Sequence, residues 1–200
     1  MGEDLEEIAG WGLMLKKAGY IGDISRYRVF ADEPKLFGFY AGNQSGNASD
    51  FFSERGALER TIAEATERAV WKKLELPVYW QKSIKEIAGY EFLDPRSLAG
   101  FSEGQKKNHK ELNFDENTPF AWTVGYSLTK KRKEFIPAQL GTAASARSLD
   151  NTEPTLRMSV TNGLSAGKNL EEALVHGALE IIEREAFMIT TPVWCFWASG

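Results

Sequence analysis

Hydrophobic and polar positions recur with two different periods along the chain, and these periods predict both helices and strands. Helical spacing of apolar residues predicts helices over 3–18, 53–73, 82–89 and 170–189, with Gly19 ending the first. Alternating or aromatic-rich runs predict strands over 27–30, 36–40, 121–128, 134–138 and 156–160. Because the order of these elements lacks a regular βαβ repeat, we expect an α+β fold with antiparallel sheets packed by helices.

Several segments follow neither period and predict loops. Residues 32–34 form a turn between the first two strands, and residues 43–50 form a polar loop. Residues 93–118 are rich in turn formers, and we interpret them as a long loop or insertion within one domain. The basic run 130–133 lies between two predicted strands, which favours a solvated hairpin tip over a phosphate site.

The composition is that of one soluble domain, with 200 residues, 42% hydrophobic and 26% charged. A net charge of −4 argues against a general nucleic-acid binder. The single Cys195 excludes an internal disulfide framework and favours a reducing, cytoplasmic setting. Its apolar neighbours make it a poor nucleophile. The acidic start and the absence of a long apolar run predict neither a signal peptide nor a membrane span.

Acidic residues on the helix predicted over 170–189 share one face. A helix advances about 100° per residue, so these positions fall within an arc of roughly 80°. The arc contains Glu172, His176, Glu180 and Glu183. The other directions are apolar, which predicts burial. Buried carboxylates need basic partners, such as Arg184 or Lys168, or a metal ion such as Mg²⁺. The alternative is that these glutamates are simply solvated.

The chain contains one internal echo. Residues 64–68 and 180–184 share the pattern E-x-x-E-R, and an Ala-Leu pair lies ten residues before the second glutamate of each. Two similar units in one chain indicate a pseudo-symmetric fold. Considered alone, the first helix is amphipathic and its Glu64–Arg68 pair is an ordinary helix-stabilising ion pair, and the echo could arise by chance.

The segment 161–168 connects a predicted strand to the glutamate-rich helix. Its small residues would let backbone amides approach a phosphate group at a helix N-terminus. It does not match a P-loop, because Asn169 follows the lysine. The alternative is a flexible connection with Asn169 as the helix cap.

The segment TNGLSAGKNLEEALVHGALEIIEREA (161–186) resembles the signature of the YcaO family, and ALERTIAEATERA (57–69) resembles the other conserved helix of that family. The segments WTVGYSL (122–128), IPAQL (136–140) and EPTLR (153–157) look like members that make azoles or act on peptides beside an E1-like partner. The resemblance implies a YcaO-like pseudo-symmetric fold. It also implies an enzyme that uses ATP and Mg²⁺ to phosphorylate a peptide backbone amide, leading to an azoline or a thioamide.

The resemblance also implies roles for individual residues. The positions matching magnesium ligands are Glu64, Glu67, Glu180 and Glu183. The positions matching nucleotide contacts are Ser165, Lys168, Glu172, Arg68 and Arg184. Lys168 stands where the family usually has asparagine, and Arg60 stands where it often has serine. No catalytic side chain is implied.

Family domains run to nearly twice this length, so we expect residues 1–200 to form a partial domain, truncated or split, with an aromatic-rich tail over 192–200. The expected partners are a peptide substrate and an E1-like or TfuA-like protein, and a homodimer is also allowed. Neither nucleic acid nor a membrane is expected as a partner. The alternative function is an inactive YcaO fragment that serves as a scaffold or docking subunit.

Overall fold

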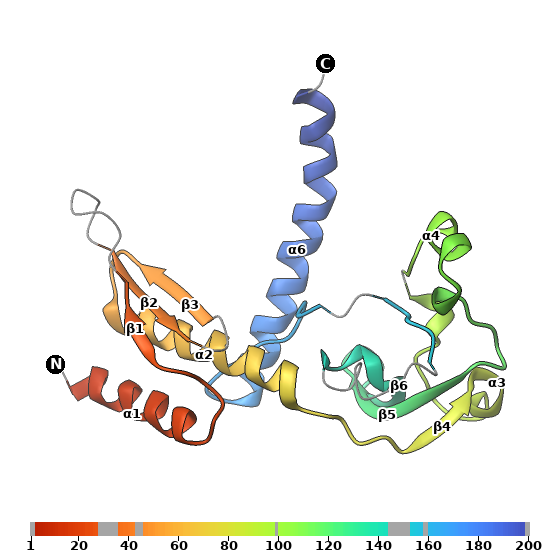
Figure 1. Cartoon of the computed structure of the whole chain (residues 1–200), viewed down its shortest axis with the longest axis horizontal. Coiled ribbons are helices and arrows are strands. Elements are labelled where there is room, and N and C mark those ends of the chain that lie inside the picture. The colour runs from red at the N-terminus through yellow and green to blue at the C-terminus, as the bar shows by residue number, and fades with distance from the viewer. Residues whose placement is uncertain are drawn as a thin grey trace. The chain divides into compact units, whose positions relative to one another are not determined.

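The protein is described here by a computed structural model that covers residues 3–27, 36–42, 46–98, 100–143, 153–157 and 160–198. The chain divides into two compact units, one formed by residues 1–70 with 161–200 and the other by residues 71–160 (Figure 1). The two helices with the E-x-x-E-R pattern therefore belong to the same unit, although the whole second unit separates them in sequence.

The first unit contains a three-stranded antiparallel sheet of β1 (Ile24–Arg26), β2 (Phe37–Ala41) and β3 (Gly46–Asp50), in that order. Ala41 lies opposite Ile24 on one side and Gly46 on the other. The strand predicted over 36–40 is confirmed. The polar loop predicted over 43–50 is wrong for 46–50, because β2 supplies hydrogen bonds that let a polar segment pair as a strand. The strand predicted over 27–30 and the turn over 32–34 lie almost wholly outside the described residues.

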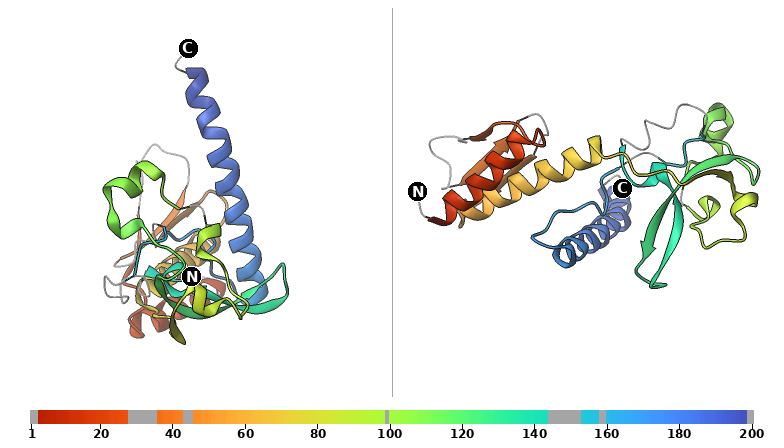
Figure 2. Two further views of the ribbon diagram at one scale, coloured as in Figure 1. Left: turned by 90° about the vertical axis from the view of Figure 1, so that its right-hand side faces the viewer. Right: turned by 90° about the horizontal axis from the view of Figure 1, so that it is seen from below.

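Helices α1 (Glu3–Lys17) and α2 (Glu54–Lys73) pack against this sheet and confirm the first two predicted helices (Figures 1 and 2). Their shared core consists of Ile8, Ile21, Ala41, Leu58, Ile62 and Ala65. Gly19 ends α1 as predicted, with a φ of 76°. Its amide donates to the carbonyl of Lys16, and the amide of Tyr20 donates to that of Leu15, which satisfies two carbonyls of the last turn.

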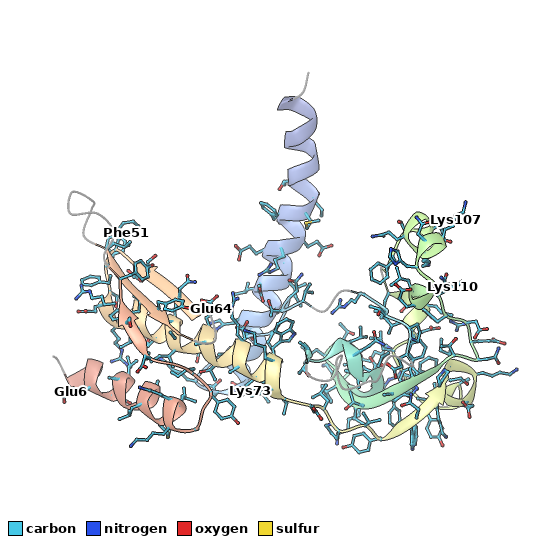
Figure 3. The ribbon with its side chains drawn as sticks, viewed as in Figure 1. Glu6, Phe51, Glu64, Lys73, Lys107 and Lys110 are labelled. Atoms are coloured by element: carbon cyan, nitrogen blue, oxygen red, sulfur yellow. The ribbon has the colours of Figure 1, made fainter. Side chains whose placement is uncertain are left out.

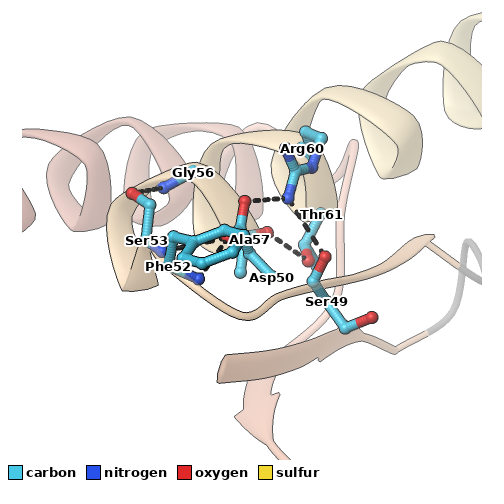
Figure 4. Close-up of polar contacts among 8 residues, drawn as sticks. All are labelled: Ser49, Asp50, Phe52, Ser53, Gly56, Ala57, Arg60 and Thr61. Carbon is cyan, nitrogen blue, oxygen red and sulfur yellow. Dashed lines mark hydrogen bonds and ion pairs between the residues drawn. The ribbon is translucent and has the colours of Figure 1, made fainter. Parts of the chain in front are cut away.

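An ionic network joins the start of α2 to the end of β3 (Figure 4). The carboxylate of Asp50 accepts hydrogen bonds from the backbone amides of Phe52 and Ser53, at 2.7 and 3.0 Å. The guanidinium of Arg60 donates to Asp50 at 2.5 Å and to the carbonyl of Ser49 at 3.0 Å. Arg60 therefore has a structural role here, tying the helix to the neighbouring strand.

Replacing Asp50 with asparagine should lower the melting temperature at pH 6 and have progressively less effect between pH 4 and pH 2. The amide of Phe52, then Arg60 and the amide of Ser53, lower the pKa of Asp50 from 3.8 to about 2. A lowered pKa means that the charged carboxylate favours the folded state, so its contribution is complete above pH 3.8 and is lost as the pH falls towards 2. Thermal melts of both proteins across this range test the expectation, and a constant difference would contradict it.

The second unit is built on a three-stranded antiparallel sheet of β4 (Trp80–Ser83), β5 (Pro119–Ser127) and β6 (Arg132–Pro137). Both predicted strands of the β5–β6 hairpin are confirmed, and the basic run 130–133 lies at its exposed tip. The core beside the sheet contains Ile84, Ile87, Phe120, Trp122 and Leu156. The helix predicted over 82–89 is shortened to α3 (Ile84–Ile87), because Ser83 ends β4 and caps the helix.

The remaining second unit contains short helices among its loops: η1 (Pro95–Ser97), α4 (Glu103–Asn108), η2 (Lys110–Leu112) and η3 (Ala138–Leu140). Figure 3 shows Lys107 and Lys110 in the region of α4 and η2. The segment 93–118 thus contains three short helices; its status as an insertion in a partial domain stays a prediction. Of the strand predicted over 156–160, the structure describes residues 156, 157 and 160, and none of these lies in a strand.

Helix α6 (Leu170–Ala198) is longer than the predicted 170–189 and largely exposed over its described side chains. Val175, Leu179 and Ile182 are 56, 57 and 63% exposed. The burial predicted from its apolar surround is therefore wrong in this structure, because no other described element covers these faces. The side chain of Cys195 lies outside the described residues. No helix among the described residues is long and apolar enough to cross a membrane.

Candidate functional site

Two glutamates of the first unit have the same kinds of hydrogen-bond partner, an arginine and a backbone amide. One carboxylate oxygen of Glu64 on α2 pairs with Arg68 at 2.6 Å, and the other accepts the backbone amide of Asn47 at 2.8 Å (Figure 3 labels Glu64). On α6, Glu180 pairs with Arg184 at 2.7 Å and accepts a backbone amide, from Gly163, at 3.1 Å. In both cases the arginine follows the glutamate by four residues and the amide precedes it by 17.

This repetition gives the E-x-x-E-R echo a three-dimensional meaning. A chance sequence match would not also reproduce the same hydrogen-bond partners at the same separations. The amide comes from β3 in the first copy and from the loop before α6 in the second, so the local backbone differs while the carboxylate environment is the same. The pseudo-symmetry predicted from the sequence is therefore present in the surroundings of Glu64 and Glu180.

The charges of both ion pairs, Glu64–Arg68 and Glu180–Arg184, act on the carboxyl group of Glu67. Burial raises the pKa of Glu67 from 4.5 to about 7, and the negative charge of Glu180 is the next cause. Glu64 raises the pKa further, whereas Arg68 and Arg184 lower it. The two E-x-x-E-R motifs thus lie near each other in the first unit, because a charge on α6 affects a carboxyl group on α2 only when the two are close.

Glu67 also lines a cavity of about 340 Å³ within the first unit. Thr66 and Val70 contribute the α2 wall, residues 164–167 contribute the loop wall, and Ala173 lies at the start of α6. The cavity combines an apolar surface with a half-buried carboxyl group of raised pKa, which is a usual property of ligand sites.

Side chains on the predicted polar face of α6 form hydrogen bonds with the backbone of the loop 161–169. The carboxylate of Glu172 accepts the backbone amide of Lys168 at 2.8 Å, and the Nδ1 of His176 donates to the carbonyl of Ala166 at 3.1 Å. Together with the bond from Gly163 to Glu180, these contacts recur every helical turn. Glu172 therefore contacts the loop backbone in this structure.

One further expectation about this loop is met at its end, whereas the roles predicted for Ser165 and Lys168 stay predictions. The side-chain oxygen of Asn169 accepts the amide of Glu172 at 2.9 Å, so Asn169 caps α6 as the sequence suggested. The hydroxyl of Ser165 donates to the carbonyl of Ala173, and Ser165 lines the cavity beside Glu67. The side chain of Lys168 is exposed and makes no hydrogen bond or ion pair with any described residue.

The structure does not bring all the predicted metal ligands together. Glu183 is exposed on α6 and has no polar partner within the described part of the chain. No group of three or more His, Cys, Asp or Glu side chains among the described residues is arranged to hold a metal ion. Instead, the guanidinium groups of Arg68 and Arg184 pair with Glu64 and Glu180.

The donor set nevertheless fits Mg²⁺ in its chemistry. Carboxylate oxygens are the ligands this ion takes in proteins, usually together with phosphate oxygens. Glu67 is half-buried and repelled by Glu64 and Glu180, and a divalent cation among the three would offset that repulsion. The predicted metal-ligand and nucleotide-contacting roles of these residues stay predictions.

The fold and the site define an α+β protein with antiparallel sheets and a carboxylate-lined cavity. The chain belongs to the YcaO family: the model of the YcaO cyclodehydratases, described as ATP- and Mg²⁺-binding, matches residues 52–197. This match confirms the family predicted from the sequence and, at the level of the family, the predicted cofactors. A search of curated proteins found no significant match.

Solved structures share the fold at low sequence identity. A heterocyclase in complex with substrate and cofactor has a TM-score of 0.62 at 18% identity, over 83% of this chain and 26% of its own. YcaO from Methanopyrus kandleri, bound with AMPPCP and Mg²⁺, has a TM-score of 0.57 at 17% identity, over 93% and 44%. The E. coli microcin synthetase complex has a TM-score of 0.52 at 16% identity, over 79% and 38%. The chain therefore spans less than half the length of these structures.

The segments IPAQL and EPTLR meet in the second unit. The side chain of Gln139 donates to Glu153 at 2.9 Å, and its carbonyl oxygen accepts the amide of Leu156 at 2.9 Å. Glu153 also accepts the amide of Ala121 on β5. Burial raises the pKa of Glu153 above its usual value. Gln139 and Glu153 thus hold the segment 153–156 against the first residues of β5, a role that the sequence did not reveal.

Sequence reasoning missed the backbone groups of the site. The amides of Asn47 and Gly163 each donate to a glutamate. Every residue except proline has such an amide, so the sequence cannot show which ones take part. The available signal was the small-residue composition around both positions. His176 was placed on the correct helical face, but its partner, the carbonyl of Ala166, required the folded loop.

Proposed function

We propose that this chain contributes the ATP- and magnesium-handling part of a YcaO enzyme that activates peptide backbone amides. The observation that carries the proposal is the convergence of two E-x-x-E-R motifs on Glu67, beside a cavity lined by the loop before α6. The proposed reaction transfers the γ-phosphate of ATP to the amide oxygen. A Cys, Ser or Thr side chain, or an external sulfide, then attacks the amide carbon, and phosphate leaves.

Each group of residues has a proposed task. Glu64, Glu67, Glu180 and Glu183 are the proposed carboxylate ligands. When bound, Mg²⁺ supplies the positive charge that neutralises the phosphates during transfer. The loop 164–167 lines one wall of the cavity and Ser165 is a proposed nucleotide contact, as are Lys168 just before α6 and Glu172 in its first turn. Arg68 and Arg184 are proposed to contact phosphate, because guanidinium groups pair well with phosphate oxygens.

The proposed substrate is a peptide, and the proposed partners are an E1-like or TfuA-like protein. The support is that one structural neighbour is in complex with substrate and another is a multi-subunit synthetase complex. An azoline and a thioamide product both follow from the same phosphorylated amide, so the sulfur source decides between them. A cytoplasmic location fits a peptide-modifying enzyme that consumes ATP.

The second candidate is a catalytically silent subunit that docks a peptide-binding protein. The observation that favours it is the absence, among the described residues, of a ready-made group of three metal-binding side chains. In that case Arg68 and Arg184 would serve as permanent partners of the glutamates. Such a subunit would bind its partner protein without needing nucleotide.

Calorimetric titration with the Mg²⁺ complex of AMPPCP, a non-hydrolysable ATP analogue, separates the two. We expect saturable binding to the 200-residue chain, and at least about tenfold weaker binding to Glu180→Gln and Glu183→Gln, because each removes a negative ligand. Glu185→Gln, an exposed change on the same helix, is the control for charge alone. Absence of binding would favour the docking subunit, and equal binding by all four proteins would remove Glu180 and Glu183 from the nucleotide site.

A further inference from the structure

Two guanidinium groups of the site are each bonded to a glutamate that is a proposed metal ligand. Arg68 and Arg184 each bind one oxygen of a glutamate, and a backbone amide binds the other oxygen. Both oxygens of each carboxylate therefore already have a hydrogen-bond partner, one of them charged and one a neutral amide. Glu67, which lines the cavity, has no arginine directly bonded to it among the described residues.

The two kinds of partner differ in how easily they can leave. The amides of Asn47 and Gly163 belong to backbone segments that pack on the helices, so they are fixed. Arg68 and Arg184 are long side chains, 40 and 53% exposed, that can move by rotating about their own bonds. An exposed ion pair between residues four apart in a helix is weak, so separating it costs little.

We infer that Arg68 and Arg184 are exchangeable place-holders: each occupies a glutamate oxygen until a metal–phosphate complex arrives, and then moves from the carboxylate to the phosphate. The inference rests on the proposed function. A metal ion alone must displace the arginines and leave them without a partner. A metal ion that carries a nucleotide supplies phosphate oxygens, which accept guanidinium groups well. The arginines thereby make the site prefer metal with nucleotide over metal alone.

The duplication of the device strengthens the inference. The same glutamate, arginine and amide arrangement occurs on α2 and on α6, with the same separations along the chain. A single ion pair would be ordinary helix stabilisation. Two equivalent pairs around Glu67 mean that both sides of the site are neutralised in the same way, and that both are released in the same way.

The test compares Mn²⁺ alone with Mn²⁺–AMPPCP, using electron paramagnetic resonance of the ion to count what is bound. In Arg68→Gln and in Arg184→Gln we expect Mn²⁺ alone to bind about two- to fivefold more tightly than in the wild type, and the double variant about tenfold more tightly, since each change frees one carboxylate oxygen. We expect Mn²⁺–AMPPCP to bind about tenfold more weakly, because the phosphate partners are gone.

Arg60→Gln is the matched control. It removes the same positive charge from the same helix as Arg68, but Arg60 pairs with Asp50 and not with a glutamate of the site. A gain in Mn²⁺ affinity that equals the gain in Arg60→Gln would reflect net charge and would overturn the inference. Weaker binding of Mn²⁺ alone by the Arg68 and Arg184 variants would also overturn it, since the arginines would then be braces that hold the glutamates in place.

Failure of the inference is distinguishable from failure of the proposed function. If the wild type does not bind Mn²⁺–AMPPCP, the proposed nucleotide site is wrong. If the wild type binds it and the arginine variants gain no affinity for Mn²⁺ alone, the site is right and the place-holder role is wrong. Circular dichroism of each variant shows whether the fold is retained, and a variant that keeps its helical signal reports on the site itself.

Discussion

Replacing Glu67 with glutamine should stabilise the metal-free protein at pH 8 and, in the same protein, abolish binding of the magnesium–nucleotide complex. Burial, then the charges of Glu180 and Glu64, raise the pKa of Glu67 from 4.5 to about 7. A raised pKa in an acid means that the folded state prefers the protonated form. The wild type therefore loses stability as the pH rises from 4.5 to 7, and keeps that loss above pH 7.

The size of the effect follows from the shift. A change of this size corresponds to at most about 3 kcal/mol, and about half of that remains after screening by solvent around a half-buried side chain. We expect the glutamine variant to melt about 5 °C higher than the wild type at pH 8, with no difference near pH 4.5. Thermal melts at both pH values test this, and a benefit of equal size at both would show that charge is not the cause.

The same substitution should raise stability but remove ligand binding. A glutamine is neutral and offers one carbonyl oxygen, so it neither repels Glu180 nor provides the negative charge that attracts Mg²⁺. We expect Mg²⁺ with AMPPCP to raise the melting temperature of the wild type and to leave the variant unchanged. Glu59→Gln, on the same helix and paired with Arg55, is the control that should respond like the wild type. An equal ligand-induced shift in all three proteins would remove Glu67 from the site.

Replacing Gly46 with alanine should destabilise the first unit by about 2–3 kcal/mol. A Cβ at this position would lie 2.5 Å from the Cβ of Ala65, 2.6 Å from its amide nitrogen and 2.7 Å from the carbonyl oxygen of Thr61. Two of these atoms belong to the α2 backbone, so the clash cannot be relieved by rotating a side chain. Forcing β3 away from the helix disturbs a packed core, and overpacking of this kind typically costs 1–3 kcal/mol.

The same displacement should also weaken the site, because the next residue, Asn47, donates its amide to Glu64. We expect Gly46→Ala to bind Mg²⁺–AMPPCP more weakly even at temperatures where it is fully folded. Gly10→Ala is the control: Gly10 lies inside α1 with nothing within 4 Å of the added methyl group, so alanine should leave stability unchanged or raise it by up to about 1 kcal/mol. Urea unfolding of both variants measures the difference, and similar curves would contradict the close approach of β3 to α2.

The helices and the central strands were predictable because local periodicity determines them. The apolar spacing of α1 and α2, the cap at Asn169, the stop at Gly19 and the β5–β6 hairpin are all properties of neighbouring residues. The strand over 46–50 was missed, since its polar sequence pairs only because β2 lies beside it. The burial of α6 was overestimated. Apolar side chains favour burial, but their sequence does not show whether another element packs against the helix.

The sequence by itself determined the family, the positions of the carboxylates and the face of α6 on which they lie. Motif spacing identifies the family, and the fixed rotation per residue of a helix places the carboxylates on one face. Only the tertiary structure decided which of these carboxylates meet. It brought Glu64, Glu67 and Glu180 into one electrostatic environment, left Glu183 exposed, and paired two of the three with arginines and backbone amides. The physical reason is that charges interact through distance in space, and the distance between α2 and α6 is set by packing that no local pattern encodes.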